Sequence, residues 1–349
     1  MATAPLADTI ARLLGLHGLL GDLVGGLIGA AIVATILLLF AALAGPYMKR
    51  KITAAFTDRI SVDRVGPYGI LTIVVDAVRL LSKELIIPEN VDRPAWDIAP
   101  FLIVLSALLG YAVIPMGNGI QLADPQNGLV YAFAVSSIAS LGLVTGGYAS
   151  NNKFSLIGAL RAVGQNIAYE IPLVLTGASV VLFAGTLKMS EIVAVQQEPL
   201  FTIAGIAIPA WFGFVNPLAF ALFMVANLAE VGRNPFDLPE SPNDIVAGYQ
   251  TEYSSVYFVL FYLGEFLHIF LGAGIVTTLF LGGPSGPILP GFVWFVLKIW
   301  GVFFFTQWAR SAVARIRPDQ VLDVGWKGML VLAFANLFLT AAIVGVIAA

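Results

Sequence analysis

The stretch SSVYFVLFYLGEFLHIFLGAGIVTTLFL, residues 254–281, decides the fold class because it is long and apolar and holds a single acid. A helix needs about 20 apolar residues to cross the roughly 30 Å hydrocarbon core of a bilayer. We therefore predict that 254–281 is a membrane-spanning helix. Its acid, Glu265, stands three residues before His268, so a helix places the two side chains on one face.

The whole chain shares this apolar character. It has 349 residues, of which 59% are hydrophobic and 11% charged, and its mean hydropathy of +0.91 lies outside the soluble range. We predict an all-α membrane protein with one integral membrane domain over residues 1–349. Its expected core is a bundle of eight transmembrane helices at about 22–47, 95–116, 127–148, 165–187, 202–229, 254–281, 289–310 and 326–348.

The N-terminal stretch does not resemble a cleaved signal peptide. It contains Asp8 and Asp22, and it lacks a basic segment and a small-residue cleavage site. The first apolar run is therefore expected to be a retained helix.

The distribution of Lys and Arg predicts the orientation. Of the 18 basic residues, fifteen fall in the loops after the first, third, fifth and seventh predicted spans. The opposite side has Arg12 and Lys188, and Lys298 lies within a span. The positive-inside rule then places the four basic loops in the cytoplasm and both termini on the outer side. We expect a multi-pass protein of a prokaryotic plasma membrane.

The first basic loop contains a further apolar piece, residues 65–84. Its polar residues form one narrow stripe at helical spacing: Thr72, Asp76, Arg79 and Lys83. We predict an amphipathic interfacial helix, because a span here would bury three charges and place the termini on opposite sides. The simpler interpretation is an ordinary surface anchor.

Several kinds of redox site are excluded by composition. The chain has no cysteine, which removes iron–sulfur ligation and disulfides, and only two histidines. Only His268 lies in a predicted span, so a bis-histidine haem is not available. We expect no metal site, no haem and no iron–sulfur cluster in this chain, and any electrons must travel in another chain.

Acids are concentrated beside and inside the membrane. The loop at 230–253 holds five carboxylates with Arg233 as the only basic residue: Glu230, Asp237, Glu240, Asp244 and Glu252. Glu170 and Glu265 lie within predicted spans. Crowded carboxylates in a low dielectric do not all ionise, and their titrations become coupled. We predict a proton relay in which Arg233 holds one acid ionised. The alternative is that each acid is a paired interior group without a role in proton transfer.

Four separated stretches resemble the quinone-channel membrane component of respiratory complex I, the proton-pumping NADH–quinone oxidoreductase family. They are AEVGRNPFDLPESPNDIVAGYQTEYSS (229–255), NNKFSLIGALRAVGQNIAYEIPL (151–173), DRVGPYGILTIVVDAVRLLSKELIIP (63–88) and WARSAVARIRPDQVLDVGWK (308–327). They occur in the family's order and span most of the chain.

The resemblance implies eight transmembrane helices plus an amphipathic helix, a quinone-access tunnel and an acidic path toward antiporter-like subunits. Quinone is the implied substrate, and an iron–sulfur subunit of the peripheral arm supplies electrons. The implied tunnel residues are Arg50, Arg59, Asp76, Phe258 and Arg310. In such a tunnel the polar stripe of 65–84 turns toward the tunnel mouth, and Asp76 is expected to meet Arg59 or Arg50. The implied relay residues are Glu170, Glu230, Asp237, Glu240, Glu252 and Glu265, with Tyr249 matching a tyrosine of the loop. Arg233 and Asp244 belong to the same acidic segment.

This sequence departs from the family pattern at several positions. Lys49-Arg50-Lys51 replaces a run that usually starts with Glu, and Ser61-Val62-Asp63 replaces Gly-Pro-Asn. Ser137 and Pro242 stand where family acids are common. The relay is therefore expected to have fewer acids, and the tunnel mouth to be more positive.

Two other functions are compatible with this pattern of acids. One is the related membrane subunit of an energy-converting hydrogenase, and the other is a stand-alone ion transporter. A transporter predicts two related halves with broken spans, which the sequence does not show. The expected partners are peripheral, small membrane and antiporter-like subunits, lipid and quinone, but no nucleic acid. NADH, reduced ferredoxin and reduced deazaflavin remain open as electron donors.

Overall fold

Helices dominate the computed structural model of the protein, which describes residues 5–13, 15, 19–117, 119–203, 206–239 and 242–348. Seven helices in these ranges are long and apolar enough to cross a membrane. They are α2 (Leu19–Leu39) continued by η1 (Phe40–Ala44) and α3 (Gly45–Phe56), α5 (Arg93–Tyr111), α6 (Gly128–Ser136) with α7 (Ile138–Ala149), α8 (Lys153–Ala184), α13 (Ser255–Phe280), α14 (Gly291–Ala312), and α15 (Pro318–Asp323) continued by η4 (Val324–Met329) and α16 (Leu330–Ala348). They correspond to seven of the eight predicted spans.

The prediction of one helix over 202–229 is wrong. After α9 (Met189–Gln196) the chain forms an antiparallel hairpin of β1 (Pro199–Ile203) and β2 (Ile206–Pro209). The short α10 (Phe212–Val215) and α11 (Pro217–Glu230) follow. α11 has 14 residues, about 21 Å, which is less than the roughly 30 Å of a bilayer core. A continuous apolar run does not distinguish strand from helix, and this run contains prolines at both breaks.

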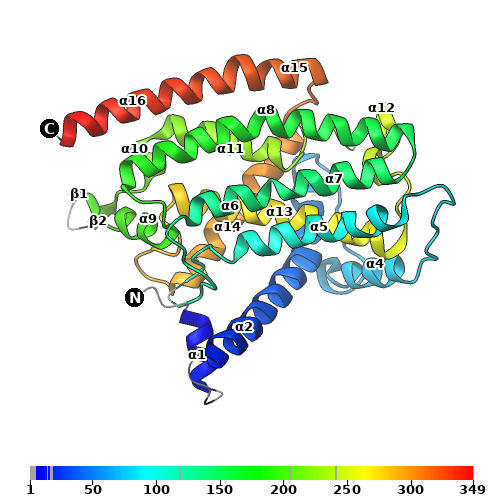
Figure 1. Cartoon of the computed structure of the whole chain (residues 1–349), viewed down its shortest axis with the longest axis horizontal. Coiled ribbons are helices and arrows are strands. Elements are labelled where there is room, and N and C mark those ends of the chain that lie inside the picture. Colours follow the sequence, from blue (N-terminus) through cyan, green and yellow to red (C-terminus); the bar gives the residue numbers. More distant parts are fainter. Residues whose placement is uncertain are drawn as a thin grey trace.

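The long helices lie side by side in one bundle (Figure 1). The helices α5, α7, α8 and α16 are layered across the view, α13 and α14 lie among and behind them, and α2 slopes away from the bundle with α1 (Pro5–Leu13) against it. Of the seven long helices, α13 is the most buried. Phe266, Phe270 and Phe280 of α13 are fully buried. The helix α1 and the far end of α16 lie at one end of the bundle, and α4 (Leu71–Leu81) and α12 (Pro242–Ile245) lie at the other.

The segment predicted as an amphipathic helix is too short to span. It contains η2 (Pro67–Gly69) and the 11-residue α4. The predicted contact of Asp76 is confirmed, since Arg50 Nη1 lies 2.6 Å from Asp76 Oδ2. Thr72 and Asp76 of the polar stripe are thus half-buried against the protein, whereas Arg79 and Lys83 of the stripe are exposed. The apolar Val74 and Val78 are also exposed. That these apolar side chains lie in the bilayer interface stays a prediction.

A close approach of two backbones positions one loop of the site. The Cα atoms of Gly158 in α8 and Gly248 in η3 (Gly248–Gln250) face each other so closely that a Cβ on Gly158 would lie 2.8 Å from Gly248 Cα and from Tyr249 N. Gly248 also has a φ of +57°, which glycine adopts without a steric penalty. These two glycines let the loop carrying Tyr249 pack directly on α8.

Candidate functional site: a cavity lined by carboxylates

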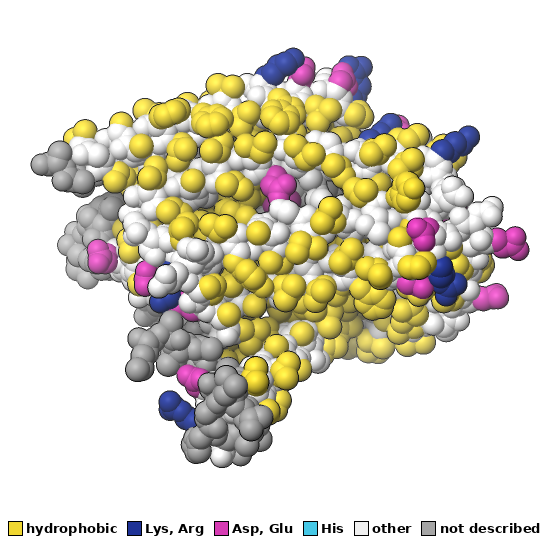
Figure 2. Space-filling model, in the orientation of Figure 1, with side chains coloured by type: hydrophobic (Ala, Val, Ile, Leu, Met, Phe, Trp, Pro, Cys, Tyr) yellow, Lys and Arg dark blue, Asp and Glu magenta, His cyan; other side chains and the backbone are white. Residues whose placement is uncertain are grey.

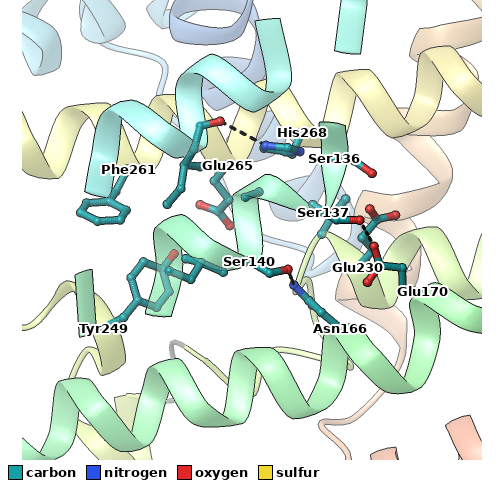
Figure 3. A pocket seen from close by; sticks show the side chains of 14 residues that line it. Ser136, Ser137, Ser140, Asn166, Glu170, Glu230, Tyr249, Phe261, Glu265 and His268 are labelled. Atoms are coloured by element: carbon teal, nitrogen blue, oxygen red, sulfur yellow. Dashed lines mark hydrogen bonds between the residues drawn. The ribbon is translucent and has the colours of Figure 1, made fainter. Parts of the chain in front are cut away.

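A narrow cavity of about 70 Å³ lies among the helices that carry the predicted relay. Its walls come from α5, α6, α7, α8, α11, η3 and α13, elements far apart in the sequence (Figure 3). A volume of this size holds several water molecules when polar groups line it. The polar lining residues are Ser136, Ser137, Ser140, Asn166, Glu170, Glu230, Tyr249, Glu265 and His268.

Glu170 lies deeper than predicted. The helix α8 begins at Lys153 rather than near 165, so Glu170 is the eighteenth of its 32 residues rather than the head of a span. It is the only acid in α6, α7 and α8, and Figure 2 shows acidic atoms in the middle of the otherwise hydrophobic face over these helices. The hydroxyl of Ser137 donates a hydrogen bond to Glu170. A carboxylate thus sits midway along a long membrane helix, where charge is costly.

Glu230 ends α11 and faces Glu170. Figure 3 shows the two carboxylates beside each other next to Ser137. Glu170 interacts electrostatically with Glu230, and Ser136 lies within hydrogen-bonding reach of Glu230. Two acidic side chains from different helices thus face each other in one cavity.

A break between two helices supplies the hydroxyls of the cavity. The helices α6 and α7 are separated at Ser137, and the hydroxyls of Ser136 and Ser137 lie 3.0 and 2.9 Å from the carbonyl oxygen of Phe133. Ser140 accepts a hydrogen bond of 2.7 Å from Asn166 Nδ2. None of these four polar residues was predicted as a site residue. The polar sequence SSIAS in the middle of an apolar span is the signal that identifies three of them.

Arg233 and Glu265 form a buried ion pair. Arg233 Nη2 lies 2.8 Å from Glu265 Oε1, and the two side chains are only 4% and 10% exposed. The guanidinium also lies 5.1 Å from the centre of the Phe266 ring. The sequence left the acid partner of Arg233 open, and the structure identifies it as Glu265 of the following helix rather than an acid of Arg233's own loop. The pair brings two opposite charges together in a buried part of the bundle.

Asp237 interacts electrostatically with arginines and with an acid of the cavity. Burial raises the pKa of Asp237, while Arg310 and Arg315 partly offset that effect and Glu265 adds to it. The Oδ1 atom is buried and has no hydrogen-bond partner among the described residues. Asp237 therefore interacts electrostatically with Arg310, a predicted tunnel residue, and with Glu265, a predicted relay residue.

The remaining acids of the 230–253 segment lie elsewhere. Asp244 is exposed and paired with Arg161 at 3.5 Å and Arg315 at 3.8 Å, basic residues that lie outside its own segment. Glu252 accepts a 2.5 Å hydrogen bond from Asn152 and lines a separate surface pocket. Glu240 lies outside the described residues. The sequence places these acids in one row, but the fold separates them.

Three of the predicted tunnel residues interact with Tyr262. Phe258 stacks on Tyr262, one turn later in α13, with ring centres 6.3 Å apart. Arg50 and Arg310 both act electrostatically on Tyr262, as do Arg233 and Glu265. Lys49, which replaces the acid usual in the family, lies 5.4 Å from the ring centre of Tyr262. Arg59 is exposed in the loop after α3.

Comparison with known proteins shows the family. A family model described as NADH dehydrogenase matches residues 28–341. The chain is 43% identical over 318 residues to the H subunit of the NADH-quinone oxidoreductase of Bacillus cereus strain B4264, covering 88% of this chain and 92% of that protein. The corresponding protein of Bacillus thuringiensis strain Al Hakam matches to the same extent. The chain thus belongs to the family of NADH-quinone oxidoreductase H subunits.

Proposed function

We propose that the chain forms the quinone-access tunnel of a proton-translocating quinone oxidoreductase and the first part of its proton path. It acts within a multi-subunit membrane complex, because the relatives are named as subunits and this chain has no cysteine to ligate an iron–sulfur cluster. Peripheral subunits deliver the electrons, and antiporter-like subunits continue the proton path. The quinone head group is expected to approach Arg50, Asp76, Phe258 and Arg310.

The observation that carries the proposal is the position of Asp237. It interacts electrostatically with both Arg310 and Glu265, and Glu265 shares a cavity with Glu170 and Glu230. Reduction of a quinone to a quinol consumes protons and changes the charge near the head group. A charge change beside Arg310 shifts the proton affinity of Asp237, and Asp237 then shifts the protonation of the acids in the cavity. Quinone chemistry and proton transfer are thereby coupled without a redox centre in this chain.

In this proposal the Arg233–Glu265 pair keeps its charges constant while the other acids exchange a proton. A buried ionised pair at 2.8 Å does not readily exchange its proton. Glu170 and Glu230 have no comparable cation in the cavity lining, which contains neither Lys nor Arg among the described residues. We infer that these two acids carry the exchangeable proton and that Glu265 supplies a constant negative charge.

The test is Glu230→Gln in the complete complex, reconstituted into liposomes. Gln keeps the shape and the hydrogen bonding of Glu but does not titrate. Proton pumping is expected to fall by about tenfold or more, as for the loss of a proton-transfer group. Assembly of the complex is expected to be retained.

Glu191→Gln is the matched control, because Glu191 is an exposed acid paired with Lys188 away from the cavity. Its variant is expected to pump like the wild type. Normal pumping by Glu230→Gln, or loss of assembly in it and in the corresponding variants of Glu170 and Glu265, would favour a structural role for the acids. Co-purification with peripheral subunits and dependence of activity on quinone distinguish this function from a stand-alone transporter and from a hydrogenase component.

A further inference from the structure

His268 lines the cavity but has no part in the function proposed above. It lies one helical turn after Glu265 on α13, and its ring reaches the cavity wall opposite Glu170 and Glu230 (Figure 3). Its Nε2 atom lies 3.0 Å from Ser106 Oγ and 3.2 Å from the carbonyl oxygen of Ile103, both on α5. Among the described residues, the ring is therefore hydrogen-bonded only at Nε2, by groups of α5.

These contacts select one tautomer of the ring. Ser106 Oγ donates its proton to the Ile103 carbonyl at 2.9 Å, so that hydroxyl has only acceptor capacity left for His268. The carbonyl of Ile103 is also an acceptor. Nε2 must then carry the hydrogen, and in the neutral ring Nδ1 is the acceptor. No hydrogen bond from the described residues reaches Nδ1.

The surroundings of Nδ1 are acidic. The titratable or charged groups facing the cavity are Glu265 on the same helix, with Arg233 paired to it, Glu170 on α8, Glu230 on α11 and Tyr249 on η3. The side of α5 contributes Ser106, which does not titrate at physiological pH. The cavity of about 70 Å³ that His268 lines together with these carboxylates has room for bridging water. The ring thus has its one free acceptor in a site that also holds groups able to release protons.

We propose that His268 is an additional proton carrier of this cavity. In the transfer step, the O–H bond of a carboxyl group breaks, its proton passes through water, and an N–H bond forms at Nδ1. The carboxylate and the imidazolium left behind carry opposite charges, and no electrons move. The Ile103 carbonyl then accepts from a charged donor, which strengthens that hydrogen bond and stabilises the imidazolium. This inference rests on the proposed function, since it adds a group to the same path.

The test is His268→Gln in the complete complex in liposomes. A Gln amide can still donate to the Ile103 carbonyl, but it cannot carry a proton. The pumping rate is expected to fall about tenfold, the effect of raising the transfer barrier by one pKa unit of free energy. The Michaelis constant for quinone is expected to be unchanged. The pH profile of pumping is expected to lose one ionisation, which a merely structural role would not change.

Ser106→Ala is the matched control, because it removes the hydroxyl that touches the ring and leaves the imidazole in place. It is expected to pump within about twofold of the wild type, because the imidazole keeps its contact with the Ile103 carbonyl and its capacity to carry a proton. Normal pumping and an unchanged pH profile in His268→Gln would overturn the inference. An equal loss in Ser106→Ala would overturn it as well, by assigning the effect to the contact rather than to the proton.

Two further outcomes keep the test decisive. If His268→Gln does not assemble, His268→Asn replaces it with the same expectation. Glu230→Gln measured in the same liposomes separates the two proposals. Loss of pumping there with normal pumping in the His268 variants contradicts only the role of His268, whereas normal pumping in both contradicts the proposed function.

Discussion

The buried charged groups near the two ends of α13 differ in how completely they are paired. Just after its C-terminal end, Lys298 of α14 donates to the carbonyl oxygens of Leu281, Gly283 and Ser285 at 2.6, 2.9 and 2.7 Å. The ammonium also lies 4.4 Å from the centre of the Trp211 ring. Three donors meet three acceptors, so every hydrogen of the ammonium is used. This charge has a fixed structural partner on each side.

In the first half of α13 the charges are only partly matched. Glu265 has Arg233, but Glu170 and Glu230 have mainly serine hydroxyls and each other. A saturated site favours one protonation state, whereas an incompletely matched one leaves two states close in free energy. The difference indicates that Lys298 stabilises the fold and that the acid cavity is suited to exchange protons.

The largest expected effect comes from removing Arg233, the cation that pairs with Glu265. Arg233→Met leaves Glu265 buried without its cation, which costs about 3–5 kcal/mol when the partner remains charged. We expect a lower thermal midpoint and poor recovery of the complex, measured by thermal unfolding of the purified complex. Adding Glu265→Gln should restore most of the stability. A double variant as unstable as the single one would show that Arg233 acts through its other contacts.

The next largest effect is expected at Lys298, whose three ammonium hydrogens all have acceptors. Lys298→Met leaves three carbonyls without their donor, at a cost of about 1–3 kcal/mol. We expect a lower thermal midpoint but normal proton pumping for each complex that assembles. Lys327→Met, which removes an exposed ion pair with Asp323, should change the midpoint much less. Loss of pumping in stable Lys298→Met complexes would contradict the structural role.

A smaller effect is expected at the predicted tunnel. Asp76→Asn breaks the pair with Arg50, whose side chain is 41% exposed, so the stability change is about 0.2–1 kcal/mol. The apparent KM for quinone should rise while the complex still assembles. Val74→Thr, a change on the exposed face of the same helix, serves as the control. Equal quinone kinetics in the wild type and Asp76→Asn would place Asp76 outside the tunnel.

The smallest effect is expected at Glu252. This acid bonds to Asn152 at the surface and does not line the cavity. Glu252→Gln should therefore pump protons at a rate close to that of the wild type. A loss as large as that in Glu230→Gln would show that the proton path includes the surface pocket.

Much of the fold was predictable because membrane helices have a strong sequence signal. Seven predicted spans correspond to long helices, and the tunnel interpretation named Arg50 as one of two partners for Asp76. The prediction of one helix at 202–229 was wrong because a run of apolar residues is compatible with both strand and helix. The helix α8 extends further toward its N-terminus than hydropathy indicated, since its first turns are polar enough to lie outside an apolar window.

The site was predictable in its residue types but not in its grouping. Intramembrane acids are costly, and that cost identified Glu170 and Glu265. The distance along the chain placed Glu252 and Asp244 with Glu230, and only the fold separates them. The break at Ser137 and the pairing of Arg233 with Glu265 depend on tertiary packing, which spacing within one helix does not reveal.

The most direct test of proton exchange in the acid cavity is the infrared difference spectrum of the complete complex between its quinone and quinol states. We predict a change in the carboxylic acid C=O band that disappears in Glu230→Gln and persists in Glu252→Gln. A spectrum without any carboxyl change, or one that is identical in the wild type and Glu230→Gln, would contradict proton exchange by this cavity.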